Sequence, residues 1–91
     1  MNITAQVRNA GRQVNTALQR VQSTERARQF AERRLEAENK RVTVGLSTTF
    51  ELFQAQRDLA GVRQQELNAI IDYNRALVDF QAVQQAPLVG R

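Results

Sequence analysis

The chain has no cysteine, no histidine and no tryptophan, and it has a single proline in 91 residues. It therefore lacks the commonest general base, the thiolate nucleophile and the usual zinc ligands. Its acidic residues are scattered among arginines and lysines at helical spacing, which is typical of a solvated charged face. The sequence predicts that the chain is not an enzyme and that it holds no metal and no cofactor.

Long apolar runs and aromatic residues are also scarce. Aromatics make up 5% of the chain, and no stretch approaches the roughly 20 apolar residues that a membrane-spanning helix needs. Met1 is followed by polar residues, so we expect no export signal in the chain as it stands. The apolar fraction of 42% comes largely from alanine and valine, which favours long thin helices over a globule with a large core.

The net charge of +4 raises the question of nucleic-acid binding. The basic excess lies in residues 1–41, where acidic residues dilute it and no basic run exceeds the pairs Arg33-Arg34 and Lys40-Arg41. A nucleic-acid partner is therefore not expected, because no dense basic patch forms.

Residues 1–43 carry the pattern of one long helix. Apolar residues recur at alternating steps of four and three, with polar interruptions at Thr24, Arg28 and Glu38. The predicted seam is Ile3, Val7, Ala10, Val14, Ala17, Val21, Thr24, Arg28, Ala31, Leu35, Glu38 and Val42. A flanking row of Leu18, Ala27, Phe30 and Ala37 widens it into a surface able to touch more than one neighbour.

The helical pattern stops and restarts within residues 44–48. Gly45 suits a left-handed helix end, and Thr48 with Glu51 fits a capping box for a second helix over 49–86. Pro87 and Gly90 are expected to end that helix, leaving 87–91 as a tail. The predicted fold is all-α, a long antiparallel, coiled-coil-like helical hairpin with its reversal near residues 44–48.

Two glycines fall inside the predicted helices, Gly11 and Gly61. Each costs roughly 1 kcal/mol relative to alanine in a helix interior. Either the long helices tolerate them, or they mark the close approach of a neighbouring backbone.

Three sequence elements in residues 31–83 resemble the TolC-like outer-membrane efflux proteins. They are Val44-Gly45-Leu46-Ser47-Thr48, then Ala55-Gln56-Arg57-Asp58-Leu59, and finally Asp72-Tyr73-Asn74-Arg75-Ala76-Leu77. In that family two long hairpins per protomer build a periplasmic tunnel in a trimer. The order and spacing of the elements agree with the family, whereas each single element is common in exposed helices.

The resemblance implies that the chain is one fragment of a larger channel protein. It would be the periplasmic portion of an outer-membrane protein of a Gram-negative bacterium, forming part of an export duct in a homotrimer. Its tip, Val44, Gly45, Leu46 and Ser47, would dock a periplasmic adaptor (membrane fusion) protein. The complex would also contain an inner-membrane transporter.

The chain departs from the family at the tunnel entrance. Better-known members have two acidic residues there, at the positions of Glu51 and Gln54, so one carboxylate is kept and one is lost. Other members close the entrance with a tyrosine and an arginine at the positions of Val42 and Ser47, so that lock is expected to be missing.

Two alternatives remain at this point. One is a structural or scaffolding coiled-coil hairpin without a conduit, and the other is the helical hairpin of the adaptor itself. A simple two-stranded coil needs one narrow seam, whereas a closed array of helices needs two contact rows. The flanking row therefore favours the channel.

Overall fold

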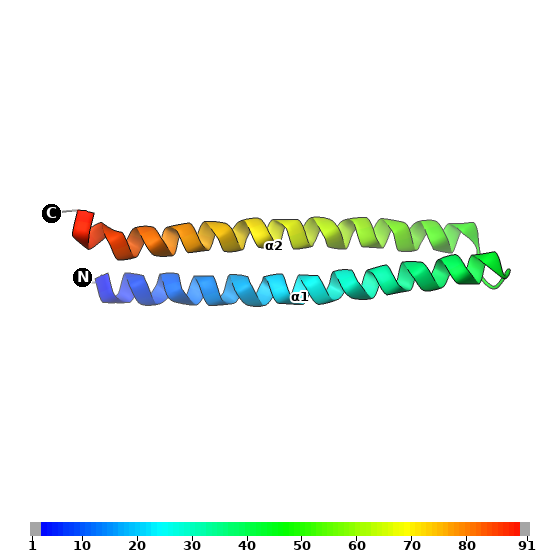
Figure 1. The fold of residues 1–91 in the computed structure, drawn as a ribbon, viewed down its shortest axis with the longest axis horizontal. Coiled ribbons are helices and arrows are strands. Elements are labelled where there is room, and N and C mark those ends of the chain that lie inside the picture. The colour runs from blue at the N-terminus through cyan, green and yellow to red at the C-terminus, as the bar shows by residue number, and fades with distance from the viewer. Residues whose placement is uncertain (1–2, 90–91) are drawn as a thin grey trace. The chain divides into compact units, whose positions relative to one another are not determined.

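The computed structural model describes the backbone of residues 3–89 and the side chains of residues 4–84. It contains two α-helices, α1 (Ile3–Thr43) and α2 (Thr49–Val89), and no strand within the described range (Figure 1). The two helices run antiparallel and the chain reverses between them. The prediction of an all-α helical hairpin with its reversal at residues 44–48 is confirmed.

The expected end of the second helix at residue 86 is wrong. α2 continues through Pro87 to Val89. A proline removes its own backbone N–H from the helical ladder and crowds the carbonyl four residues earlier, which disfavours the helix but does not end it here. The expected role of Gly90 lies outside the described residues.

The chain divides into two compact units. One unit combines residues 1–22 with 68–91, and the other is residues 23–67. In both, the predicted seam of α1 faces α2: every seam position from Val7 to Val42 is buried or half-buried. The side chain of Ile3 is outside the described range.

The unit of residues 1–22 and 68–91 has a core of small side chains. Ala10 is 7% exposed and Ala69 is completely buried. A Cβ atom on Gly11 would lie 3.7 Å from the Phe80 ring, an ordinary van der Waals contact. Arg20 and Asp72 form an ion pair of 2.7 Å between the two helices.

The unit of residues 23–67 buries Ala31, Ala55 and Leu59. The polar interruption at Arg28 is explained by its partners: its Nε lies 2.7 Å from Glu66 and its Nη1 lies 2.9 Å from Glu32. The hydrogen bond that Arg28 donates to Glu32 is the main reason that the pKa of Arg28 is raised. A seam arginine therefore stays charged and joins α1 to α2.

The flanking row of α1 makes little contact with α2. Leu18 is half-buried, but Ala27 and Ala37 are exposed and Phe30 is 70% exposed. α2 likewise leaves several of its large apolar side chains exposed, which are Phe50, Phe53, Leu67, Ile70, Ile71 and Val78. Gly61 has nothing within 4 Å of the position of an added Cβ, so no backbone of the described residues approaches it closely.

Candidate functional site at the helix reversal

α1 ends in a Schellman motif centred on Gly45. The Leu46 N–H donates to the Arg41 carbonyl (2.7 Å), and the Gly45 N–H donates to the Val42 carbonyl (3.1 Å). Gly45 has φ +78°, a left-handed conformation that costs glycine nothing. The Arg41 guanidinium also donates to the Leu46 carbonyl at 3.4 Å. The reversal is thus a hydrogen-bonded turn.

Thr48 caps α2 as the sequence predicted. The Glu51 N–H donates to Thr48 Oγ1 at 3.2 Å, and the Leu52 N–H donates to the Thr48 carbonyl at 3.1 Å. The first bond satisfies a backbone donor that has no partner inside the helix, and the second is the first i→i−4 bond of α2, accepted by the cap residue. The cap therefore fixes the start of α2 at Thr49.

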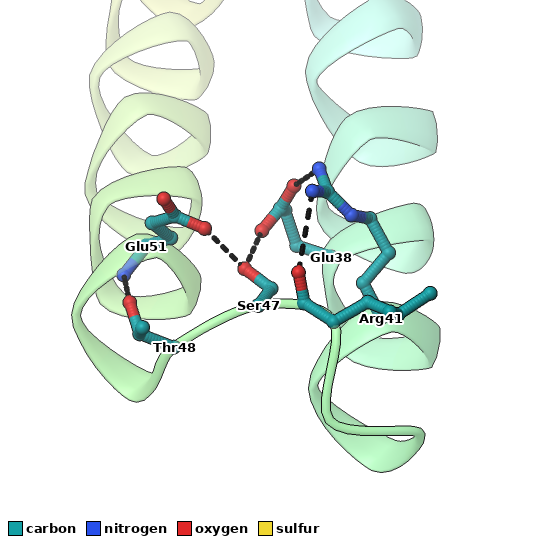
Figure 2. Close-up of polar contacts among 6 residues, drawn as sticks. Glu38, Arg41, Ser47, Thr48 and Glu51 are labelled. Carbon is teal, nitrogen blue, oxygen red and sulfur yellow. Dashed lines mark hydrogen bonds and ion pairs between the residues drawn. The ribbon is translucent and has the colours of Figure 1, made fainter.

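Ser47 joins the two helices at the turn (Figure 2). Its hydroxyl lies 2.6 Å from Glu38 Oε2 on α1 and within hydrogen-bond distance of Glu51 Oε2 on α2. The other oxygen of Glu38 is 2.9 Å from Arg41 Nη1. A hydroxyl has one hydrogen to donate, so the two carboxylates compete for it.

The same contacts set the ionisation of Glu51. Its pKa is lowered, first by the hydrogen bond from Ser47, then by the Thr48 backbone N–H and the positive charge of Arg41; partial desolvation opposes them. The Thr48 contribution matches the second half of the predicted capping box. Glu51 is therefore held as a carboxylate at the start of α2.

The apolar residues of the turn and of the start of α2 are exposed. Val44 is 67% exposed, Leu46 is 70% exposed and Phe50 is 70% exposed. Leu46 therefore does not cover the end of α1. Among the four predicted tip residues, Val44, Gly45 and Leu46 are exposed, whereas Ser47 is half-buried and turned toward Glu38 and Glu51.

The two predicted entrance residues lie in the first turns of α2. Both Glu51 and Gln54 are exposed. Glu51 is engaged by Ser47 and Thr48, and Gln54 forms no hydrogen bond with the described residues. Val42 continues the half-buried seam.

Sequence reasoning missed the role of Glu38. It counted Glu38 as a polar interruption of the seam, yet the side chain is only 12% exposed between Arg41 and Ser47. The available signal was a charged residue at a seam position next to a predicted turn. Such a residue needs partners, because a partly buried carboxylate is costly without them.

The described residues contain no group of three or more acidic side chains arranged to hold a metal ion. Within the same range, neither helix has a stretch long and apolar enough to cross a membrane. No protein-family profile, curated protein or solved structure matches the chain.

Proposed function

We propose that the chain is the periplasmic hairpin of a TolC-like outer-membrane efflux channel and that its tip docks a periplasmic adaptor protein. The observation that carries the proposal is the turn: Val44 and Leu46 are held outward on a backbone closed by Gly45. Clustered exposed apolar side chains mark protein-binding surfaces. This cluster lies at the position where the resemblance puts the adaptor contact.

The full-length channel would be a homotrimer that reaches an inner-membrane transporter through the adaptor. In it the hairpin forms part of the duct wall, and Glu51 contributes a carboxylate near the periplasmic mouth. Gln54 adds none, so this mouth would hold multivalent cations less well than one with two acidic rings. Neither role requires chemistry from the hairpin.

A scaffolding hairpin is the second candidate, because the regular seam of α1 alone would support it. The exposed Phe30 in the flanking row of α1 favours the channel. A two-stranded scaffold needs no such second contact row, whereas a helix in a tubular array does. The hairpin of an adaptor shares the two-helix architecture, and the three sequence elements named above favour the channel side.

The test compares Gly45→Val with Gly61→Val in the full-length channel. Valine at residue 45 is strained by the positive φ, whereas residue 61 is helical and has open space around it. We expect Gly45→Val to reduce efflux and adaptor cross-linking while the trimer still reaches the outer membrane. Gly61→Val should preserve all three.

Leu46→Ser supplies a second variant that leaves the backbone unchanged. It removes an exposed apolar side chain, so it should weaken cross-linking without affecting assembly. Normal efflux and cross-linking in both Gly45→Val and Leu46→Ser would refute the docking role.

A further inference from the structure

The outward side of α2 in the unit of residues 23–67 carries a row of exposed apolar side chains. Phe53, Ala60 and Leu67 are spaced seven residues apart. At about 3.6 residues per turn, this spacing places them on one side of the helix, two turns apart. Phe53 is 60% exposed, Leu67 is 51% exposed, and Ala60 is also exposed. The row is separate from the side of α2 that carries the buried Ala55 and Leu59.

One arginine lies on this side. Arg57 follows Phe53 by one turn, is exposed, and forms no ion pair with the residues that the structure describes. Its charge is therefore not balanced locally, unlike that of Arg34 or Arg28, which have carboxylate partners at 2.7 Å. The outward side thus combines apolar area with an available positive charge.

The carboxylates of α2 in this unit are all directed elsewhere. Asp58 pairs with Arg34 of α1, Glu66 pairs with Arg28 of α1, and Glu51 contacts Ser47 in the turn. None is free to neutralise a basic partner on the outward side. A surface that offers arginine without carboxylate favours an acidic partner and disfavours a basic one.

We propose that the row formed by Phe53, Arg57, Ala60 and Leu67 docks a helix of another protein that combines apolar contact residues with carboxylates. Apolar side chains of the partner would cover Phe53 and Leu67, and a carboxylate would lie level with Arg57. The geometry suits a helix, because the row follows one side of α2 for about four turns. The inference does not depend on the channel proposal.

A second copy of the chain fits this row poorly. The exposed side of α1 in the same unit has Phe30, but Arg26 and Arg33 flank it within one turn, and neither has an ion-pair partner among the described residues. Pairing that side with the row would bring arginine toward Arg57. Like charges in an interface are unfavourable, so an acidic partner is preferred.

The experiment measures binding of two synthetic helical peptides to the full chain by fluorescence anisotropy. Both peptides have leucines at seven-residue spacing; one places glutamates beside them and the other lysines. We expect the glutamate peptide to bind at least about tenfold more tightly than the lysine peptide. Arg57→Glu should reverse that preference. Arg33→Glu, the matched control with the same charge change on α1, should retain it.

Phe53→Ser tests the apolar part of the row. This substitution should weaken binding of the glutamate peptide in high salt as well as in low salt, because salt does not screen the burial of apolar surface. All substituted positions are exposed, and unchanged helicity would show that the variants fold.

Three results would overturn the proposal. The first is equal loss of glutamate-peptide binding in Arg57→Glu and Arg33→Glu, which would indicate diffuse electrostatic attraction. The second is binding to phosphatidylglycerol-containing vesicles, lost in Arg57→Glu, without discrimination between the peptides. The third is self-association that buries Phe53 and is lost in Phe53→Ser.

Discussion

The same substitution, glycine to alanine, should have opposite effects at residues 45 and 61. At Gly45 an added Cβ has nothing within 4 Å, so crowding contributes nothing and only the φ of +78° matters. A left-handed residue with a side chain costs about 1–2 kcal/mol. Alanine also lowers the conformational entropy of the unfolded chain, which stabilises the folded state by about 0.4–1 kcal/mol. Gly45→Ala should therefore destabilise the chain by about 1 kcal/mol.

Gly61 lies in the interior of α2, also with nothing within 4 Å of an added Cβ. Alanine there gains helix propensity of about 1 kcal/mol with no steric cost. The two variants should thus differ by about 2 kcal/mol. Gly45→Asn should lower the free energy of unfolding less than Gly45→Ala does, because asparagine tolerates a left-handed backbone better than most residues.

Urea unfolding followed by circular dichroism, at one fixed chain concentration, measures these differences. A neutral or stabilising Gly45→Ala would refute the assignment of the positive φ to the turn. A destabilising Gly61→Ala would show that another backbone approaches this side of α2, which is the alternative role considered for this glycine.

Two further predictions concern the turn and the core. Because the folded-state pKa of Glu51 is lowered, its contribution to stability is complete above the unfolded-state pKa and is lost as pH falls through the folded value. Glu51→Gln should flatten this acid limb in unfolding experiments across pH, and Ser47→Ala should raise the Glu51 pKa measured by NMR. Ala69 is completely buried whereas Ala60 is exposed, so Ala69→Leu should destabilise by about 1–3 kcal/mol and Ala60→Leu should be nearly neutral in the same urea assay.

The parts of the fold that depend on local sequence were predictable. The seam of α1, the Gly45 helix end and the Thr48 cap are each set by residues within a few positions of one another. Even the polar seam residue Arg28 lies where the periodicity placed it. The end of α2 was not predictable in this way, because Pro87 disfavours but does not forbid a few more helical residues.

The parts that depend on partners far along the chain were not predictable. That Arg28 meets Glu66, or that Glu38 meets Ser47, follows only once the register between the helices is known. The exposure of Leu46 was also not predictable, because a leucine after a helix end often packs back on the last turn. In this Schellman motif the residues that Leu46 would contact are Arg41 and Lys40, five and six positions earlier; both end in charged groups, and Leu46 remains exposed.

The closed turn also affects how tightly a partner can bind its apolar residues. A flexible loop loses conformational freedom when it binds, and fixing the backbone of each residue costs roughly 1–2 kcal/mol. In this chain the hydrogen bonds of Gly45 and Leu46 already fix the backbone that carries Val44 and Leu46. A binding partner therefore meets a preorganised surface, so most of the energy of covering these side chains appears as affinity.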